Sequence, residues 1–364
     1  VSGKGCLLTG ADGKQYIDLT SGIGVTGFGV ADEQWLAAVT AQLTQLQHVS
    51  NLYYTAPCAK LAQLLCEKTG MKKVFFANSG AEANECAIKY ARKYSQDKKG
   101  KQYSVIITLQ NSFHGRTLTT LAATGQDHFH QYFQPLTPDF IHVAAGDCDG
   151  LAKLTETYPV AGIMLECVQG EGGVLPLSEE FVRFAAKLCA EKDIPLIIDE
   201  VQTGNGRTGK LYAYMHYGIN PDIVSTAKGL GGGLPIGACM VSEKMQDVLQ
   251  PGDHGSTYGG NPVCCAGALS ILSRLDEELL AQVREKSEYV FSALTGAEGI
   301  ESVTGKGLMI GIKTKKNAKD IVNACIEKGV LCLTAKDKVR LLPALNIPMQ
   351  QLKQAVEVIK EAAK

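Results

Sequence analysis

Two residues of opposite charge stand where an enzyme could use them. Asp199 directly follows the apolar run 196–198 (LII), and Lys228 precedes the glycine-rich stretch 229–233 (GLGGG). Pyridoxal phosphate chemistry requires a carboxylate that pairs with a protonated ring nitrogen and an amine that forms an imine. A desolvated lysine with no other charge nearby is shifted toward that neutral amine. Taken singly, Asp199 could equally cap a loop, and Lys228 could be a solvated surface charge.

The segment 78–85 (NSGAEANE) follows an apolar run and has the pattern of a helix start. Ser79 and Glu82 have the spacing of a capping box. The backbone N–H groups of Ser79, Gly80 and Ala81 would then face out of the first helical turn, where the helix dipole also favours a bound phosphate. A capped helix with nothing bound explains the same residues equally well.

The segment 112–117 (SFHGRT) places an aromatic ring, an imidazole and a guanidinium within four residues after another apolar run. Phe113 could stack on an aromatic ring, and Arg116 could bind a carboxylate through two parallel hydrogen bonds. His114 has no comparably clear role. The structural alternative is a core phenylalanine, a hydrogen-bonded histidine and a surface arginine.

The pattern Gly-x-Gly-x-x-Gly occurs at residues 22–27 and 204–209. Chance matches are expected among 39 glycines. Neither match is convincingly followed by a helix with an acidic residue about 20 positions on, as a dinucleotide site would require. We interpret both as loops, which leaves a nicotinamide-dependent dehydrogenase as a weaker alternative.

Short apolar runs alternating with amphipathic segments would position these residues. Between residues 74 and 241 the runs lie at 74–77, 104–109, 161–165, 195–198 and 222–225. The segments between them, such as 180–189, have apolar residues at helical spacing. This alternation predicts an α/β fold with a parallel sheet covered on both faces. Ligands bind such sheets at the carboxyl ends of the strands, which is where the motifs fall.

The character of the chain changes after Asn261. We expect long charged helices around residues 262–274 and 277–294, a strand at 307–312 and a final helix at 349–363. Strands near residues 6–8 and 16–19 would join this α+β domain. We therefore predict an N-terminal segment of the small domain at 1–44, a large domain at 45–260 and a C-terminal small domain at 261–364.

The composition favours small-molecule chemistry over nucleic-acid or membrane partners. The 36 basic and 37 acidic residues nearly cancel, so no long-range field attracts a polyanion. No apolar run approaches the roughly 18 residues of a spanning helix, and no signal peptide begins the chain. The 12 scattered cysteines lack a CxxC pair, which is typical of reduced thiols and argues against a zinc cluster. We expect a cytoplasmic protein without a metal. Because the chain starts without methionine, we expect an N-terminal arm to be missing.

With these residues assembled, the chain resembles the class III, fold type I pyridoxal phosphate-dependent aminotransferases, most closely the acetylornithine aminotransferases of arginine biosynthesis. The resemblance covers essentially the whole chain. It rests on six segments in family order: 78–85 (NSGAEANE), 113–117 (FHGRT), 166–173 (ECVQGEGG), 199–204 (DEVQTG), 227–233 (AKGLGGG) and 256–262 (STYGGNP). It implies a large domain with a mostly parallel seven-stranded sheet covered by helices, and a smaller α+β domain built from both termini.

The resemblance also implies how pyridoxal 5'-phosphate is held. Lys228 would form the Schiff base, Asp199 would pair with the ring nitrogen, and Gln202 would touch the phenolic oxygen. Phe113 and Val201 would sandwich the ring. The remaining cofactor-binding residues would be Ser79, Gly80, Ala81 and His114, with Thr257 completing the phosphate site of a neighbouring subunit. A homodimer with composite active sites follows from that last assignment.

For the substrates, the resemblance implies two arginines with different tasks. Arg116 would bind the carboxylate remote from the reacting amine, and Arg340 would bind the α-carboxylate of 2-oxoglutarate. Glu171 would pair with Arg340 while the first substrate is bound and release it for the second. Glu166 and Ser256 complete the predicted substrate-binding set.

The implied reaction is a ping-pong transfer of the δ-amino group of N2-acetyl-L-ornithine to 2-oxoglutarate, giving N-acetyl-L-glutamate 5-semialdehyde and L-glutamate. Ornithine, succinylornithine and 4-aminobutyrate remain alternative donors, although segments 51–54 (NLYY) and 78–81 favour acetylornithine. A cofactor-binding regulator is disfavoured by the full set of charged residues. The chain departs from the family at Val30, where a histidine is usual, and at Ala344, where a second proline is usual. Neither position carries chemistry, so only packing or specificity is in doubt.

Overall fold

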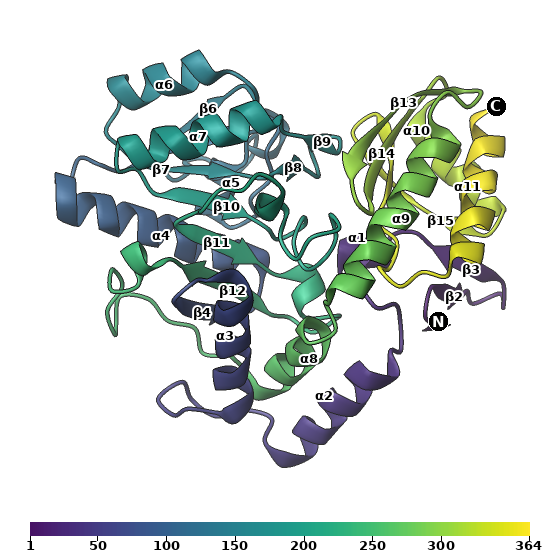
Figure 1. The fold of residues 1–364 in the computed structure, drawn as a ribbon, viewed down its shortest axis with the longest axis horizontal. Helices are drawn as coiled ribbons and strands as arrows, with labels where there is room; N and C mark the ends of the chain where they lie inside the picture. The colour runs from purple at the N-terminus through teal and green to yellow at the C-terminus, as the bar shows by residue number, and fades with distance from the viewer.

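The computed structural model describes residues 1–364. Figure 1 shows two regions side by side, a larger one around a central sheet and a smaller one that contains both chain ends. No helix is both long enough and apolar enough to cross a bilayer.

The larger region is built on a seven-stranded sheet. Its strand order is β4 (Lys73–Ala77), β12 (Gly237–Val241), β11 (Ile223–Thr226), β10 (Leu196–Asp199), β7 (Val160–Leu165), β5 (Val105–Leu109) and β6 (Phe140–Val143). β12 runs antiparallel to both of its neighbours, and the other pairs are parallel. Every residue of β5, β7, β10, β11 and β12 is buried, as expected for strands covered on both faces. The predicted mostly parallel sheet is confirmed.

Alternate strand residues face two different hydrophobic clusters. Ile106, Met164 and Ile197 pack with the apolar side of α4 (Gly80–Lys99). Ile107 and Ile198 belong to a larger cluster that includes α3 (Ala56–Thr69), α6 (Cys148–Thr157) and α7 (Glu179–Glu191). Helices therefore cover both faces of the sheet, and β4 and β6 form its two edges.

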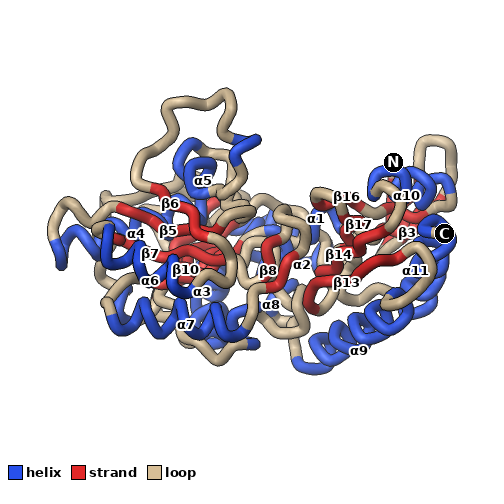
Figure 2. The backbone as a smooth tube through the Cα atoms, turned by 90° about the horizontal axis from the view of Figure 1, so that it is seen from above, coloured by secondary structure: helices blue, strands red, loops and turns tan.

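The smaller region joins the two ends of the chain. β1 (Ser2–Lys4), β2 (Leu7–Thr9) and β3 (Gln15–Asp18) form a sheet with β15 (Val330–Leu331), which pairs in parallel with β3. A second sheet has the order β13 (Ile300–Lys306), β14 (Met309–Thr314), β17 (Lys338–Leu341) and β16 (Leu333–Ala335). α9 (Glu277–Leu294), α10 (Ala318–Glu327) and α11 (Met349–Ala363) accompany these sheets (Figure 2).

One helix differs from its prediction. α8 (Pro262–Leu272) contains no charged residue and packs against α2 (Glu33–Gln45) and α3, beside the larger sheet (Figure 1). The sequence predicted a charged helix belonging to the C-terminal domain. The charged positions begin only at Arg274, so α8 is an apolar helix of the larger region. This packing favours a domain boundary after α8, although the boundaries predicted at residues 44 and 260 remain predictions.

The remaining elements are short. They are α1 (Ser21–Gly24), α5 (Leu118–Ala123), the two-stranded sheet of β8 (Val168–Gln169) and β9 (Leu175–Pro176), and the 3-10 turns η1 (Asp127–Phe129), η2 (Ala213–His216), η3 (Lys228–Leu230) and η4 (Glu243–Met245). Because β4, β5, β10 and β11 run in the same direction, the loops that follow them meet at one edge of the sheet.

Candidate active site

A cavity of about 470 Å³ lies at that edge. Residues at or just after the ends of five strands, β4, β5, β7, β10 and β11, line it, and Val25 and residues 234–236 close other sides. Most of the predicted site residues line this single cavity: Ser79, Gly80, Ala81, Phe113, His114, Arg116, Glu166, Asp199, Val201, Gln202 and Lys228. Glu171 and Arg340 adjoin it through Gln202, whereas Ser256 and Thr257 line a separate depression.

Asp199 is buried at the end of β10 and accepts three hydrogen bonds. The N–H of Val201 donates to Oδ1 at 2.9 Å, and Asn84 Nδ2 donates to Oδ2 at 2.8 Å. His114 Nδ1 lies 2.8 Å from the same Oδ2, which requires the proton on Nδ1. These donors stabilise a buried carboxylate in its charged form. Asp199 can therefore present a fixed negative charge to the cavity.

His114 lies behind Asp199 and is almost completely buried. Burial alone would lower the pKa of its imidazole, but the hydrogen bond and negative charge of Asp199 outweigh burial and raise that pKa. Nε2 is buried and has no hydrogen-bond partner. His114 thus acts on Asp199 through Nδ1.

Lys228 projects into the cavity from the turn that follows β11. Its Nζ makes no hydrogen bond or ion pair within the chain, unlike most charged groups near it. Burial lowers the pKa of this amine, against the opposing charges of Glu171 and Asp199. The backbone of Lys228 has a φ of 43°, in the left-handed region that non-glycine residues adopt at a cost of order 1 kcal/mol. Such strain persists at functional sites when the surrounding fold holds the residue there.

The first turn of α4 forms one end of the cavity. Ser79 Oγ accepts a hydrogen bond from the Glu82 N–H at 3.2 Å, as predicted. Glu82 Oε2 accepts from the Asn78 N–H at 2.9 Å, one residue earlier than in a capping box. The first-turn N–H groups have no intrahelical acceptor and are available to an anion. At Gly80 a Cβ atom would lie 2.6 Å from Val201 Cγ1, so the close approach of these two segments requires glycine.

Glu166 links two loops of the site. Its Oε1 accepts from the Phe113 N–H at 2.8 Å, and its Oε2 accepts from the Gly170 N–H at 3.4 Å. Burial raises the pKa of this carboxyl to about 7. The side chain therefore helps to place Phe113 and the segment before Glu171, in addition to the substrate contact that was predicted for it.

We call Glu171, Arg340 and Gln202 the gate. Arg340 Nη1 donates to Glu171 Oε1 at 2.5 Å, and Gln202 Nε2 donates to the same oxygen at 3.3 Å. Gln202 Oε1 also lies 3.4 Å from Arg340 Nη1. Burial would raise the pKa of Glu171, but the charge and hydrogen bond of Arg340 lower it. These contacts of Gln202 with the ion pair were not predicted from the sequence; its predicted contact with a phenolic oxygen remains a prediction.

Ser256 and Thr257 lie outside the main cavity of their own chain. Ser256 Oγ accepts hydrogen bonds from Asn78 Nδ2 at 3.2 Å and from the Gly259 N–H at 2.9 Å. Thr257 is exposed in a depression shared with His48. The structure therefore does not bring Thr257 to the amides of α4 in the same chain.

Comparison with known proteins identifies the family. The family model described as "Aminotransferase class-III" matches residues 1–363. The chain belongs to the class III aminotransferases. An acetylornithine aminotransferase from Haemophilus ducreyi is 51% identical over 99% of this chain and 92% of its own length. One from Aquifex aeolicus is 45% identical over 99% of this chain and 96% of its own length.

Solved structures of this class III family also match over the whole chain. An N-acetylornithine aminotransferase from Stenotrophomonas maltophilia has a TM-score of 0.87 at 33% identity and is covered over 94% of its chain. An ornithine aminotransferase from Toxoplasma gondii has a TM-score of 0.96 at 30% identity and is covered over 89% of its chain. This class III enzyme is a pyridoxal phosphate-dependent aminotransferase that acts on small molecules, as predicted.

The cavity fits pyridoxal 5'-phosphate by its own chemistry. Its volume of about 470 Å³ lies within the range of roughly 300–1,000 Å³ typical of cofactor sites. Asp199 offers a carboxylate, and Lys228 offers an amine without another partner. The first turn of α4 offers N–H groups, and Gly80 lets Val201 pack directly against that turn.

The sequence analysis missed Asn84. This residue is buried on α4, donates to Asp199 and to the His114 carbonyl oxygen, and accepts from Ser225 Oγ at 2.5 Å. It lies within the recognised 78–85 segment, and a polar residue on the apolar face of an amphipathic helix was the available signal. Val25 was also missed, because the segment 22–27 was interpreted only as a loop.

Proposed function

We propose that this aminotransferase transfers the δ-amino group of N-acetylornithine to 2-oxoglutarate, a step of arginine biosynthesis. The observation that carries the proposal is the arrangement of charges around the cavity. Arg116 lines the cavity and has no ion-pair partner, whereas Arg340, on β17, is neutralised by Glu171. Lys228 lines the same cavity, also without an ion-pair partner. The relatives named acetylornithine aminotransferases support this choice of donor.

In this proposal Asp199 would pair with the ring nitrogen, and Phe113 and Val201 would contact the two faces of the ring. Gly80 and its neighbours would bind the phosphate, and Lys228 would hold the cofactor through Nζ. When bound, pyridoxal phosphate supplies an electron sink for the pair left behind when the substrate carbon loses a proton. The role of the protein is to fix the orientation of that ring.

Lys228 Nζ moves the proton. Its lowered pKa favours the neutral amine, which can accept a proton from the substrate carbon that carries the reacting nitrogen. The amine has no competing hydrogen-bond partner in the chain, so it would be free to reach that carbon.

The gate lets one cavity accept two differently charged substrates. The reacting carbon of N-acetylornithine carries no neighbouring carboxylate, so Glu171 neutralises Arg340 during that half-reaction. The reacting carbon of 2-oxoglutarate carries one, and Arg340 binds it after Glu171 moves away. Arg116 binds the remaining carboxylate in each case.

We also propose that the enzyme is a homodimer. Thr257 is exposed and lies outside the cavity of its own chain, where it is free to complete the phosphate site of a second copy. Tyr53 and Tyr54, near the same depression, are exposed to 67% and 102%, as surfaces that pack against a partner often are in an isolated chain. Light scattering on the purified holoenzyme should give twice the chain mass of 38.9 kDa.

A cytoplasmic location is the final part of the proposal. All 12 cysteines are free thiols, and most are buried. Thiols persist in reducing compartments, where disulfides are rare. Fractionation of cells that produce the protein tests this location.

Ornithine is the second candidate donor, because solved ornithine aminotransferases align with TM-scores of 0.95 and 0.96. The deciding experiment measures kcat/KM for N-acetylornithine, ornithine, succinylornithine and 4-aminobutyrate with 2-oxoglutarate as acceptor. We expect N-acetylornithine to exceed ornithine and 4-aminobutyrate by tenfold or more, about 1.4 kcal/mol in transition-state binding. Equal values for ornithine would refute the proposed donor while leaving the aminotransferase assignment intact.

A further inference from the structure

Arg116 is held in place without using any of its hydrogen-bonding groups. It lines the cavity and is exposed, and no hydrogen bond or ion pair joins its guanidinium to another residue of the chain. Two aromatic rings hold it instead. Its Cζ lies 4.2 Å from the ring centroid of Phe129 and 5.4 Å from that of Phe113.

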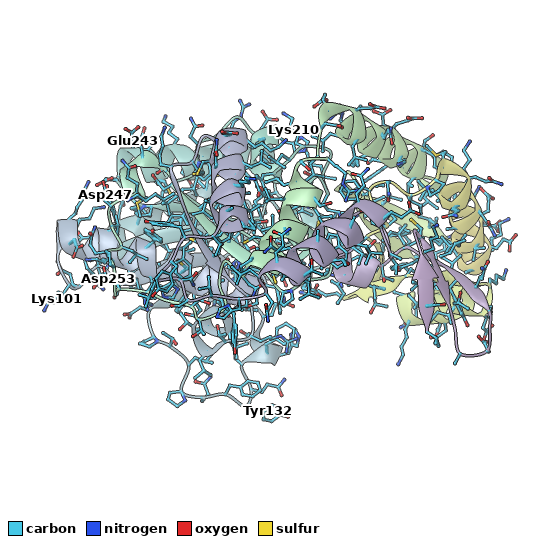
Figure 3. All side chains as sticks on the ribbon, turned by 90° about the horizontal axis from the view of Figure 1, so that it is seen from below. Lys101, Tyr132, Lys210, Glu243, Asp247 and Asp253 are labelled. Carbon is cyan, nitrogen blue, oxygen red and sulfur yellow. The ribbon has the colours of Figure 1, made fainter.

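Phe129 lies outside every motif that identified the site. It ends the 3-10 turn η1, at the base of a loop that projects from the body of the molecule between α5 and β6 (Figure 2). Figure 3 labels Tyr132 at the far end of that loop. The loop is therefore largely solvent-exposed, while its first turn reaches the active site.

The base of this loop is anchored to the segment that carries Arg116. Gln126 Nε2 donates to the Ser112 carbonyl oxygen at 3.0 Å, and the Phe129 N–H donates to the Gln126 carbonyl oxygen at 3.0 Å. The rings of Phe129 and Phe113 meet edge to face with centroids 5.7 Å apart. Phe113, Arg116 and Phe129 thus form one packed cluster at the cavity wall.

An aromatic face and a carboxylate would hold a guanidinium with different consequences. A carboxylate of the protein would occupy the N–H donors and cancel the charge. An aromatic face attracts the cation through its quadrupole and contacts only the flat side of the group, so all five N–H donors remain free at the edge. A guanidinium held in this way is ready to bind a carboxylate of a ligand through two parallel hydrogen bonds.

We infer that Phe129 is a positioning residue for Arg116 and so a determinant of specificity for donors that carry a carboxylate remote from the reacting amine. This inference rests on the proposed role of Arg116. Removing the aromatic ring at position 129 should weaken binding of such ligands and leave the chemical step unchanged, because Lys228 and Asp199 do not contact Phe129.

The experiment uses N-acetylnorvaline as its probe, since this compound has the acetyl group and carboxylate of N-acetylornithine but no reacting amine. Calorimetry gives its dissociation constant for the dimeric holoenzyme and for Phe129→Leu, Phe129→Tyr, Arg116→Ala and Phe133→Leu. Leucine keeps apolar bulk without the aromatic face, and tyrosine keeps the face. Phe133 lies in the same loop, is 52% exposed and does not line the cavity, so it serves as the matched control.

We expect Phe129→Leu to raise the dissociation constant about fivefold and to raise KM for N-acetylornithine in parallel, with kcat unchanged. Phe129→Tyr should restore binding to within twofold, and Phe133→Leu should match the wild type. Melting temperature and cofactor absorbance, measured on every variant, report whether the fold and the cofactor site are intact.

Two results separate this inference from the proposed function. If Arg116→Ala leaves the dissociation constant unchanged, Arg116 does not bind the carboxylate and both proposals fail. If Arg116→Ala weakens binding but a well-folded Phe129→Leu does not, the positioning role of Phe129 is wrong and the proposed function stands. A fall in kcat without a change in binding would also overturn the inference.

Discussion

The pair Asp199 and Lys228 and the gate both lie at one cavity but are built in different ways. Asp199 and Lys228 come from adjacent strands of one sheet, in which Asp199 pairs with Ser225, three residues before Lys228. The gate joins a loop of the larger region, which carries Glu171, to β17 of the smaller region, which carries Arg340. Backbone pairing fixes the first distance. The second depends on the ion pair, on Gln202 and on packing between the regions, where Thr304 Oγ1 donates to the Val174 carbonyl oxygen at 2.9 Å.

In the proposed function, this difference separates the residues of the chemical step, Asp199 and Lys228, from the gate, which selects the substrate. Asp199 is saturated by three donors and cannot shift without breaking buried hydrogen bonds. The Glu171 side chain is 29% exposed and bonds only to other gate residues. A rotation of the Glu171 side chain would break only contacts within the gate and would leave the hydrogen bonds of Asp199 intact. The predictions below test this separation, from the largest expected effect to the smallest.

Lys228→Met should abolish transamination, with a loss of about four orders of magnitude in kcat, because no other amine lines the cavity to move the proton. Burial disfavours the charged amine, so the cofactor-free variant should be at least as stable as the wild type. Single-turnover assays and thermal melts measure both effects.

Borohydride reduction followed by peptide mapping should place the cofactor on Lys228 in the wild type only. The exposed Lys210→Met is the control, and activity within tenfold of wild type would contradict the assignment.

Asp199→Asn should lower both half-reactions equally, by about 10²–10³-fold, because asparagine keeps the shape but removes the charge that stabilises a protonated ring nitrogen. An equal loss of rate in the two half-reactions is the critical outcome, because the proposal assigns Asp199 to the chemical step and not to the choice of substrate. Rapid-mixing measurements with each substrate test it. A loss confined to one half-reaction would show that Asp199 and the gate are not separate.

Glu171→Gln should change the ratio of the rates of the two half-reactions by about tenfold. With its charge no longer neutralised, Arg340 should still bind 2-oxoglutarate, while the N-acetylornithine half-reaction slows. Asp337→Asn is the matched control, because it breaks the surface ion pair of Lys313 and Asp337 next to β17 without touching the cavity. If both half-reactions of the Glu171 variant slow equally, the gate does not select.

The smallest effect is a pH dependence of stability that belongs to the gate. Arg340 lowers the pKa of Glu171 below its ordinary 4.5, so the folded carboxylate contributes stability above that pH. The contribution is lost as the pH falls through the lowered folded value. The free energy of unfolding should differ between wild type and Glu171→Gln by about 1 kcal/mol near neutral pH, and the difference should shrink below about pH 4.5. Denaturant titrations at several pH values would show a constant difference if Glu171 were unpaired.

In the seven-stranded sheet, the strands that precede the candidate site residues were predicted from the sequence, but two others, β12 and β6, were not. β5, β7 and β10 are largely apolar runs of the kind that parallel sheets show, and β11 begins with the apolar pair Ile223 and Val224. β12 reads Gly-Ala-Cys-Met-Val, with little β propensity, and becomes a strand only because β4 and β11 lie on either side of it. β6 is an edge strand interrupted by His142, so its pattern alone did not mark it.

The candidate site was predictable where a motif follows a strand directly. Asp199, Lys228 and Gly80 fall into this class, since the end of a strand fixes their place. The hydrogen bond from Asn84 to Asp199 and the contact of Phe129 with Arg116 join residues far apart in the chain. Such contacts depend on tertiary packing, which local spacing does not encode.

The pairing of β3 with β15 also has a consequence for biosynthesis. Ile17 pairs with Val330, so the first strands leave the ribosome long before their partner is made. At about 5–20 residues per second, this wait lasts roughly 15 to 60 seconds. During translation β3 can pair with β2 at once and the larger sheet can form first, while the edge of β3 that faces β15 stays unpaired and open to chaperones or proteases. Arg340 follows β15 by nine residues, so the proposed gate can be completed only late in translation.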